Sequence, residues 1–305
     1  MGTAEIACPG LESLHSSSTF NVVSVVTQPD RPRGRKLELQ PSPVKKTALD
    51  LGIATLQPKT LRTEESWGVL ADLKPDLIVV IAFGQILPQH VLDLPAHGCV
   101  NVHTSLLPKY RGAAPIQWAI HDGETETGVT LMKMDAGLDT GPIIACAQTV
   151  IGQSNAQELH DELANLGAQL LRDALPGYVA GKISPTPQKD AEATHARKIT
   201  KEDGKVNWQR TAVEIERAIR AFTPWPGAYT SISESESIIL KIHKAKTAKG
   251  TGAPGEVLGG GSERLLVACG NEALELTVLQ RPGSRRLSAP EFLRGFPIRP
   301  GSVLG

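Results

Sequence analysis

An asparagine and a histidine stand two positions apart near the end of a strongly apolar part of this sequence. Asn101 and His103 lie in "GCVNVH", which follows the apolar run "DLIVVIA" at residues 76–82. On an extended strand, residues i and i+2 point to the same side, so both polar side chains can face one cavity. A carboxylate comes from "MDAGLDTGPII", a glycine-containing stretch with Asp135 and Asp139. The sequence thus offers an amide, an imidazole and a carboxylate for one site.

These three kinds of side chain suit a reaction in which negative charge develops on a carbonyl oxygen. An amide and a histidinium can donate to an oxyanion, and a carboxylate can orient the histidine or move protons. A protein nucleophile is not indicated, because the chain has no G-x-S-x-G motif and Ser105 in "TSLLP" has no signature of an adjacent base. Direct attack of a substrate on a carbonyl carbon is therefore favoured. A polar pair at a strand end is also common as a structural hydrogen-bonding feature, and the spacing alone leaves both interpretations open.

Composition and charge limit the class of protein. The 305 residues are 40% hydrophobic and 21% charged, which predicts a globular protein large enough for two domains. An apolar run of roughly 18 residues is absent, so no membrane span is expected. Lys plus Arg equal Asp plus Glu at 32 each, so a nucleic-acid partner would need a local basic patch. The four cysteines stand singly, which indicates a reducing compartment and argues against a structural zinc site.

The site residues must be positioned by secondary structure. In the first half of the chain, strand patterns alternate with helix patterns. Strands are predicted at residues 21–27, 53–58, 76–82 and 98–103, with helices at 42–52, 64–73, 87–95 and 113–123. This alternation predicts a parallel α/β sheet, which binds ligands outside the carboxyl ends of its strands. The runs "GVTLMKMD" and "CAQTVIG" add strands, expected to be antiparallel at one edge. In the helix that follows, Ser154 and Gln157 predict a capping box.

The second half of the chain has a different pattern. A polar, proline-containing stretch predicts a linker at residues 184–204, between a domain at 1–183 and another at 205–305. A helix at 211–222 then stops before two prolines. Five short β-type runs broken by glycine turns follow it and predict a small barrel.

Four stretches together give the chain a specific resemblance to a known family. "NVHTSLLPKYRGAAPIQWAI", "TGVTLMKMDAGLDTGPI", "VTQPDRPRGRKLELQPSPVK" and "RAFTPWPGAYT" resemble the methionyl-tRNA formyltransferases, in order and over nearly all 305 residues. The N-x-H and L-D-T-G pair alone would indicate only the wider group of formyl-tetrahydrofolate-dependent transferases and hydrolases. The resemblance implies an α/β fold, with a Rossmann-like formyltransferase domain and a small C-terminal OB-like β-barrel domain that binds tRNA.

The resemblance also implies a reaction and its residues. The α-amino group of methionyl-initiator tRNA would attack the formyl carbon of 10-formyltetrahydrofolate, for translation initiation and without a covalent enzyme intermediate or a metal. Asn101 and His103 would stabilise the tetrahedral oxyanion, while Asp139 keeps His103 charged and helps pass a proton from the amine to the leaving nitrogen. The implied co-substrate contacts are Ser105, Leu106, Leu107 and Pro108, with Phe83 and Gly84 lining the pterin slot.

The implied tRNA contacts lie in a basic loop that, in the family, enters the acceptor stem. They are Arg31, Arg33, Arg35 and Lys36. The loop departs slightly from the family pattern, because "GRKL" stands where relatives read G-R-G-x-K-L. Without the resemblance, an ordinary solvated surface loop would be the simpler interpretation. From Lys241 to Gly305 there are ten Lys or Arg against five Asp or Glu, so a basic barrel surface around "RPGSRRL" is also expected to contact tRNA.

One departure concerns the amino terminus. Relatives begin with a strand just before the G-T turn, whereas this sequence begins at Met1-Gly2-Thr3. Loss of a central strand would expose the backbone groups of its neighbours. We therefore expect a natural start upstream, or a truncated reading frame.

Alternatives follow from the same residues. The enzymatic ones are a formyltransferase that acts on a sugar-nucleotide amine and a formyltetrahydrofolate deformylase, neither of which needs the arginine-rich loop. An inactive RNA-binding homologue is an alternative of another class, against which the intact set of Asn101, His103 and Asp139 argues. We expect a monomer without a membrane partner, in the bacterial cytoplasm or, for a eukaryotic parent, in an organelle matrix or stroma.

Overall fold

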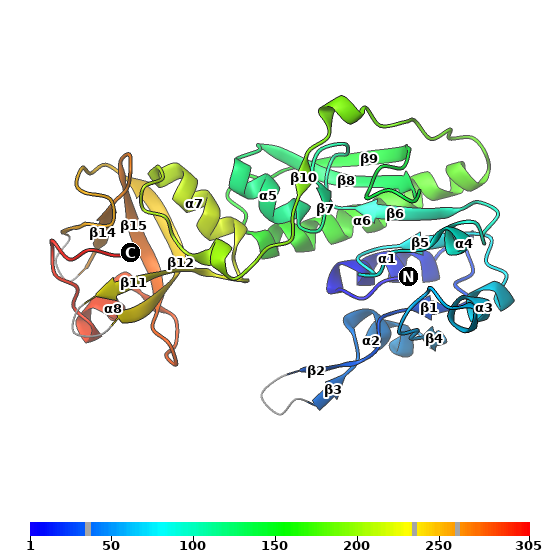
Figure 1. The fold of residues 1–305 in the computed structure, drawn as a ribbon, viewed down its shortest axis with the longest axis horizontal. Coiled ribbons are helices and arrows are strands. Elements are labelled where there is room, and N and C mark those ends of the chain that lie inside the picture. Colours follow the sequence, from blue (N-terminus) through cyan, green and yellow to red (C-terminus); the bar gives the residue numbers. More distant parts are fainter. Residues whose placement is uncertain (34–37, 234–236, 260–262) are drawn as a thin grey trace. The chain divides into compact units, whose positions relative to one another are not determined.

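The structure is a computed structural model that describes residues 1–33, 38–233, 237–259 and 263–305 (Figure 1). These residues form two compact units. Unit 1 comprises Met1–Pro115, Glu126–Val150 and His160–Ala196, and unit 2 comprises Ile116–Thr125, Ile151–Leu159 and Arg197–Gly305. Two helices, α5 (Pro115–Asp122) and α6 (Ala156–Val179), contribute residues to both units. In the described part of the chain, no helix is both long and apolar enough to cross a membrane.

Unit 1 is built on a four-stranded sheet in the order β5-β6-β8-β9 (Figure 1). Its strands are β5 (Ile78–Val80), β6 (Cys99–His103), β8 (Glu126–Lys133) and β9 (Ile143–Val150). β5 and β6 run parallel, whereas β6 and β8, and β8 and β9, are antiparallel pairs. The predicted antiparallel strands at one edge of a parallel sheet are thereby confirmed. Most residues of β6 and β8 are buried, as expected for strands with both faces covered.

Shorter strand pairs complete unit 1 in the described ranges. They are β1 (Val25–Val26) with β4 (Thr55–Leu56), β2 (Arg31–Arg33) with β3 (Glu38–Gln40), and β7 (Arg111–Gly112) with β10 (His195–Ala196). The β2–β3 pair is an antiparallel hairpin that projects from the rest of unit 1 (Figure 1). The parallel β7–β10 pair joins residues of the predicted linker to the segment that follows β6.

The described residues of unit 1 also form several helices. They are η1 (Glu5–Ala7), α1 (Cys8–His15), α2 (Pro43–Asp50), α3 (Glu64–Asp72), α4 (Gln89–Leu92), η2 (Asp190–Glu192) and most of α6. α6 lies against β6 and β8 because Gly167 has no side chain: a Cβ there would be 3.0 Å from Val102 Cγ1. Ser42 caps α2 by accepting a hydrogen bond from the Lys45 N–H, and Pro43 starts the helix.

The predicted capping box of α6 is wrong by one residue. The Asn155 side chain accepts hydrogen bonds from the N–H groups of Gln157 and Glu158, and the Glu158 carboxylate accepts one from the Asn155 N–H. Both Ser and Asn are good N-cap residues, and Asn155 stands three residues before a glutamate. The carboxylate of Glu158 therefore completes the box that the amide of Gln157 was predicted to form with Ser154.

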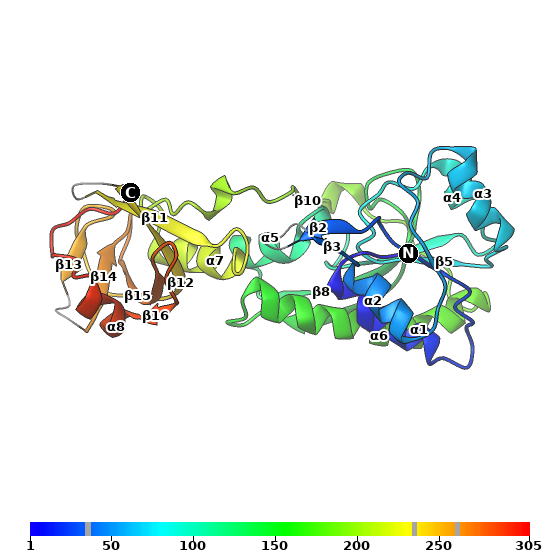
Figure 2. The ribbon, with the colours of Figure 1, turned by 90° about the horizontal axis from the view of Figure 1, so that it is seen from below.

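Unit 2 is a curled sheet with an α-helix packed on its core (Figures 1 and 2). The strand order is β11-β12-β15-β14-β13, with β16 paired to β15. The strands are β11 (Ala228–Ser233), β12 (Ser237–Ala248), β13 (Val257–Gly259), β14 (Leu265–Ala268), β15 (Ala273–Gln280) and β16 (Leu287–Ser288). The helices are η3 (Glu202–Gly204), α7 (Ala212–Ala221) and α8 (Ala289–Gly295), besides residues of α5. The OB-like barrel fold predicted for this part of the chain is confirmed.

Alternation along the strands explains the core of unit 2. Leu240 and Ile242 of β12, and Leu274 and Leu276 of β15, point inward and are buried. Ile219 of α7 packs on the same core. A capping box of Thr211 and Glu214 begins α7, in the stretch where a helix was predicted.

Candidate active site

Asn101 and His103 lie on β6, at the end where the parallel strand β5 also finishes. Asn101 is half-buried, whereas the His103 side chain is only 7% exposed. β6 pairs with β8 through Asn101 opposite Met132 and His103 opposite Thr130, which fixes the register of both polar residues. They are two positions apart on one strand and therefore share a side of it.

Asp139 reaches this strand end from the loop that joins β8 to β9. The loop is closed by Asp135, whose carboxylate accepts hydrogen bonds from the Gly137 N–H at 3.0 Å and the Thr140 hydroxyl at 2.7 Å. Asp139 itself has φ +54°, a left-handed backbone conformation that Asp and Asn tolerate better than most residues. Of the two aspartates in the predicted stretch, Asp135 thus holds the loop and Asp139 faces Asn101 and His103.

The structure brings the three predicted catalytic side chains together. His103 Nδ1 lies 3.7 Å from Asp139 Oδ2, and Asn101 Nδ2 lies 3.5 Å from Asp139 Oδ1. The backbone N–H of Gly112 donates a hydrogen bond to Asp139 Oδ2 at 2.9 Å. Oδ2 is therefore the more firmly held oxygen, whereas within the described ranges the Asn101 amide, at 3.5 Å, is the one hydrogen-bond partner of Oδ1.

The second ring nitrogen of His103 fixes the orientation of the imidazole. Nε2 lies 2.9 Å from the Tyr110 carbonyl oxygen. A carbonyl can only accept a hydrogen bond, so Nε2 carries a proton and donates it. The nitrogen that faces Asp139 is consequently Nδ1, and a histidinium would present its second N–H on that side.

A segment of the predicted linker also contacts the Asp139 loop. Gln188 donates from Nε2 to the carbonyl oxygens of Asp139, at 2.8 Å, and Gly141, at 2.7 Å. Its Oε1 accepts two hydrogen bonds from Arg111, at 3.0 Å from Nε and 2.8 Å from the terminal nitrogen. Arg111 is only 5% exposed and also pairs with Asp190 at 2.8 Å. This chain of contacts determines the position of the Asp139 backbone.

The four candidate folate residues after His103 differ in their surroundings. Ser105 is fully buried, and its hydroxyl donates to the Lys109 carbonyl at 2.6 Å. Leu107 is buried with its N–H bonded to Thr130 Oγ1, whereas Leu106 and Pro108 are partly exposed. The side chains of Ser105 and Leu107 are therefore held in the protein interior. Leu106 and Pro108 are the members of the group whose side chains reach solvent.

Phe83 and Gly84, the candidates for the pterin slot, follow the end of β5. The Phe83 side chain is 2% exposed and packs in the core beside Leu87 and Val91. Gly84 is exposed with φ +80°, and its carbonyl accepts a hydrogen bond from Gln28 Nε2 at 2.7 Å. Phe83 thus supports the turn from inside, and the backbone of Gly84 is the accessible part.

The predicted tRNA-binding residues belong to the β2–β3 hairpin. Arg31 is exposed on β2 and its guanidinium donates to the Gln28 side chain. Arg33 lies in the same strand, whereas Arg35 and Lys36 lie outside the described residues. Asp30 anchors the base of the hairpin, because its carboxylate accepts hydrogen bonds from Lys45 at 2.7 Å and Gln57 at 2.7 Å. These contacts hold the pKa of Asp30 below its ordinary value.

Sequence reasoning missed Gln188, Arg111 and Gly112 as parts of this site. Arg111 and Gly112 stand within the quoted segment "NVHTSLLPKYRGAAPIQWAI", so an arginine beside a glycine close to the N-x-H pair was an available signal. Gln188 stands 47 residues after Gly141, and no spacing in the sequence indicates that the two are in contact.

Comparisons with known proteins agree with this geometry. Residues 1–175 match the family described as "Formyl transferase", and residues 198–297 match "Formyl transferase, C-terminal domain". The methionyl-tRNA formyltransferase of Citrifermentans bemidjiense is 49% identical over 306 residues, which cover 100% of this chain and 95% of that protein. The methionyl-tRNA formyltransferase of Aromatoleum aromaticum is 50% identical over 301 residues, with 98% and 94% covered.

A solved structure supports the fold independently. The crystal structure of WlaRD, a sugar 3N-formyl transferase, superposes with a TM-score of 0.67 at 20% identity and covers 93% of this chain and 97% of that chain. The resemblance predicted from the sequence is therefore confirmed over both units. From its sequence and its fold alike, this chain belongs to the formyl transferase family.

Proposed function

We propose that this protein transfers the formyl group of 10-formyltetrahydrofolate to the α-amino group of methionyl-initiator tRNA, for translation initiation. The observation that carries the proposal is the full-length match to proteins named methionyl-tRNA formyltransferase, at 49% identity over 306 residues. The convergence of an amide, an imidazole and a carboxylate at one strand end supports it, because these groups suit formyl transfer without a protein nucleophile.

The reaction follows from the positions of the three side chains. The neutral α-amino group attacks the formyl carbon, a new carbon–nitrogen bond forms, and the carbonyl oxygen takes the negative charge. The Asn101 amide and the Nδ1–H of a protonated His103 donate to that oxygen, while the Tyr110 carbonyl keeps the ring oriented through Nε2. Collapse of the tetrahedral intermediate then breaks the bond between the formyl carbon and N10 of the folate.

Asp139 serves the proton transfers of this reaction. Its Oδ1 atom, which has a long contact of 3.5 Å to Asn101, accepts a proton from the attacking amine and returns it to the leaving nitrogen. Oδ2 meanwhile stays bonded to the Gly112 N–H and beside His103. The products are formylmethionyl-tRNA and tetrahydrofolate, and no proton is lost in the overall transfer.

Further assignments belong to the same proposal. Leu106, Pro108 and the backbone of Gly84 contact the folate, with Ser105, Leu107 and Phe83 supporting them from the interior. Arg31 and Arg33, with Arg35 and Lys36 of the same loop, contact the tRNA. The protein acts as a monomer with a catalytic domain at 1–183 and a tRNA-binding domain at 205–305, in the bacterial cytoplasm; the two relatives named above come from bacteria.

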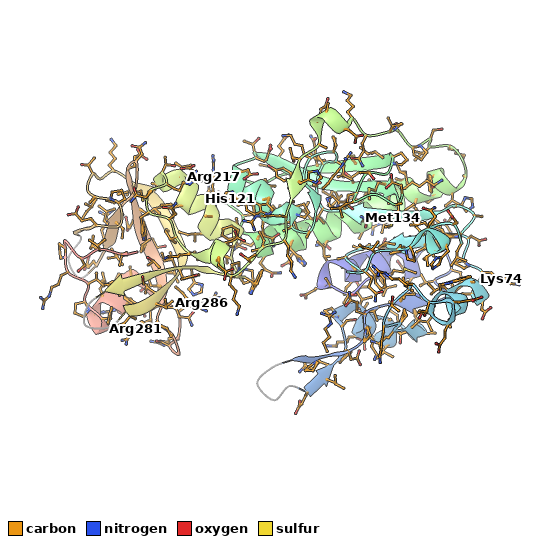
Figure 3. The ribbon with its side chains drawn as sticks, in the orientation of Figure 1. Lys74, His121, Met134, Arg217, Arg281 and Arg286 are labelled. Atoms are coloured by element: carbon orange, nitrogen blue, oxygen red, sulfur yellow. The ribbon has the colours of Figure 1, made fainter. Side chains whose placement is uncertain are left out.

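Basic residues of unit 2 support the proposal that a charged tRNA provides the amino group that receives the formyl group. Arg281, Arg285 and Arg286 are exposed in the turn between β15 and β16, and Arg281 and Arg286 are marked in Figure 3. Lys241 on the neighbouring strand β12 is also exposed. Clustered cations of this kind supply affinity for a phosphate backbone.

A formyl-transfer assay with competing acceptors tests the proposal. Radiolabelled 10-formyltetrahydrofolate is incubated with the protein and, separately, with charged initiator tRNA, free methionine and a sugar-nucleotide amine. We expect label on the tRNA alone. Label on the sugar-nucleotide amine alone would replace the proposed acceptor, and release of free formate without transfer would indicate a deformylase.

A further inference from the structure

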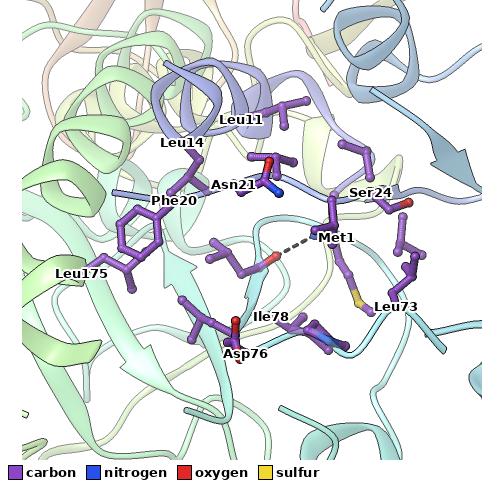
Figure 4. Close-up of a pocket in the computed structure, with 18 of the residues that line it drawn as sticks. Met1, Leu11, Leu14, Phe20, Asn21, Ser24, Leu73, Asp76, Ile78 and Leu175 are labelled. Atoms are coloured by element: carbon purple, nitrogen blue, oxygen red, sulfur yellow. Dashed lines mark hydrogen bonds between the residues drawn. The ribbon is translucent and has the colours of Figure 1, made fainter. Parts of the chain in front are cut away.

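The segment that follows β1 makes hydrogen bonds to several other parts of unit 1. Residues 19–26, up to the end of β1, border an apolar cavity of about 510 Å³ (Figure 4). Residues 27–30 come next and lead into the β2–β3 hairpin. The Thr27 hydroxyl lies 2.7 Å from that of Ser42, which caps α2. The contacts of Gln28 extend furthest, because they reach both the hairpin and the turn after β5.

The side chain of Gln28 uses its amide nitrogen and its oxygen in different directions. Nε2 donates to the carbonyl oxygens of Phe83, at 3.1 Å, and Gly84, at 2.7 Å. Oε1 accepts a hydrogen bond from the Arg31 guanidinium. Carbonyl oxygens can only accept, so the amide nitrogen must face the turn and the oxygen must face the arginine. One side chain thus joins the candidate folate turn to the first arginine of the hairpin.

Gly84 shows how closely these two segments approach each other. A Cβ on Gly84 would be 2.7 Å from Gln28 Nε2, and the backbone of Gly84 has φ +80°. A side chain at this position would therefore displace the Gln28 amide as well as strain the backbone. The turn after β5 and the start of the hairpin are consequently in direct contact through Gln28.

A second set of contacts fixes the backbone of Gln28. Its carbonyl oxygen accepts from Gln57 Nε2 at 2.9 Å, and the same nitrogen donates to Asp30 Oδ1 at 2.7 Å. Lys45 of α2 donates to Asp30 Oδ2 and to Gln57 Oε1, both at 2.7 Å. Hydrogen bonds in such a network strengthen one another. The Gln28 side chain therefore extends from a backbone that is itself held in place.

Arg31 is oriented by Gln28 without losing its charge. An arginine has five N–H donors in a planar fork that suits a phosphate. Within the described ranges, Gln28 is the one hydrogen-bond partner of the Arg31 side chain, which is exposed. A neutral amide restricts the guanidinium but does not compete with an anion for its charge. The other N–H groups of Arg31 can therefore meet a phosphate.

We propose that Gln28 is a positioning residue for both substrates of the proposed reaction. Its Nε2 holds the turn at Gly84 against the folate, and its Oε1 orients Arg31 toward a phosphate of the tRNA. These roles rest on the proposed function, in which Gly84 contacts the folate and Arg31 contacts the tRNA. A single side chain then sets the spacing between a tRNA phosphate and the folate that donates the formyl group.

Steady-state formyl transfer by the full chain, from 10-formyltetrahydrofolate to charged initiator tRNA, separates the two roles. Gln28→Leu removes both donors and the acceptor at similar volume. We expect it to raise KM for the tRNA about tenfold and KM for the folate roughly three- to tenfold, with kcat within about threefold of the unchanged protein. Arg31→Leu should raise only KM for the tRNA, because it leaves the contacts to Phe83 and Gly84 in place.

The double variant distinguishes positioning from a general effect on the hairpin. If Gln28 acts on the tRNA through Arg31, Gln28→Leu should add less than about twofold to KM for the tRNA in the Arg31→Leu background. Independent effects would instead multiply in the double variant, and that result would overturn the proposal.

A second variant and a control complete the experiment. Gln28→Glu keeps the shape and an acceptor for Arg31, but it has no N–H for the two carbonyls. It should raise KM for the folate as Gln28→Leu does, so this role is tested even where the leucine variant fails to fold. Gln89→Leu is the matched control, because Gln89 is an exposed glutamine that donates to Asp93 at the end of α4. It should leave both KM values unchanged.

Each contrary result has a separate meaning. An unchanged KM for the folate in both Gln28 variants would refute the contact that holds the turn. In a protein that does formylate tRNA, equal KM values for the tRNA in Gln28→Leu and Gln89→Leu would refute the role of Gln28 and leave the proposed function standing. Absence of transfer to tRNA by the unchanged protein would refute the proposed function and, with it, the role of Gln28.

Discussion

At the scale of single residues, the candidate site divides into groups that we propose to meet the substrate and groups that hold them in place. Asn101 and His103 lie 3.5 Å and 3.7 Å, respectively, from the carboxylate of Asp139. Tyr110, Gly112 and Gln188 hold them through backbone and amide hydrogen bonds. This division gives separate expectations for variants in each group.

Loss of an oxyanion donor should reduce turnover with little effect on folding. We expect Asn101→Ala and His103→Ala each to lower kcat by roughly 100- to 1000-fold, because one hydrogen bond to the developing oxyanion is removed. Single-turnover formyl transfer gives the rate, and circular dichroism with thermal unfolding checks the fold. Near-normal turnover in either variant would remove that residue from the mechanism.

Gln188 should act as a positioning residue. In Gln188→Glu the carboxylate can still pair with Arg111, but it has no N–H to donate to the carbonyls of Asp139 and Gly141. We expect kcat to fall by about 10- to 100-fold, since a small displacement of a catalytic group has effects of that size, with KM for the folate nearly unchanged.

The neighbouring Lys189→Ala serves as the control for that variant. Lys189 is exposed and its side chain pairs with Glu192, outside the Asp139 loop. A KM effect without a kcat effect in Gln188→Glu, or equal losses in both variants, would contradict positioning by Gln188.

At the scale of helices and strands, much of the framework could be predicted from local patterns. β6 and the strands of unit 2 follow from apolar runs bounded by glycine turns, and α7 follows from Thr211, Glu214 and the prolines after it. Asn101 and His103 could be placed because they are close in sequence and share a strand. The glycine-containing stretch indicated a carboxylate, but the choice of Asp139 over Asp135 needed the family resemblance, since Asp139 is 38 positions from Asn101.

The pairing of β7 with β10 could not be predicted in this way. His195 lies opposite Arg111, and the segment between them in sequence contains two long strands and α6. The region around His195 is polar, and a strand of two residues is too short to show the alternation that marks a strand. Gln188 could not be predicted either, because it lies in the same polar stretch, which has no strand or helix pattern.

The stability of the folded protein is expected to depend on pH because of His243, which lies on β12 in unit 2. Burial lowers the pKa of His243 below 6.5, and the cations of Arg286 and Lys241 act in the same direction, while the hydrogen bond to Gln280 opposes them. The unfolded chain then binds a proton more readily than the folded one. The contribution of His243 to stability is present above pH 6.5 and is lost as the pH falls below that value.

Urea unfolding at several pH values measures this effect. We expect the free energy of unfolding to decrease from pH 7.5 to pH 5, and the decrease to be smaller in His243→Gln, which does not titrate in that range. A pH profile identical in the two proteins would exclude His243 as a source of the dependence.

At the scale of the whole molecule, neutral overall charge coexists with local concentrations of cations. The chain carries 32 basic and 32 acidic residues, yet ten Lys or Arg stand against five acidic residues from Lys241 onward. Long-range attraction to a polyanion is therefore weak, and binding should depend on contacts made by particular basic residues.

Affinity for initiator tRNA should accordingly fall with added salt. We expect a loss of about tenfold or more between roughly 50 and 200 mM salt, because each neutralised phosphate releases counterions. Filter binding at several salt concentrations gives the slope, which should be shallower for Arg286→Glu than for the unchanged protein. Arg294→Glu, an exposed charge change on α8, is the control. A flat response to salt would exclude these cations as the source of affinity.

Because Gly112 has no side chain, it limits how far the polar segment around His195 and the Asp139 carboxylate can move. A Cβ at this position would approach the Ala196 carbonyl oxygen to 2.8 Å, and φ is +115°, so even alanine is sterically excluded. The same residue supplies the N–H that steadies Asp139. The absence of a side chain at Gly112 thus lets two distant stretches of polypeptide share a single attachment point, and neither can shift without disturbing Asp139, the proposed proton acceptor.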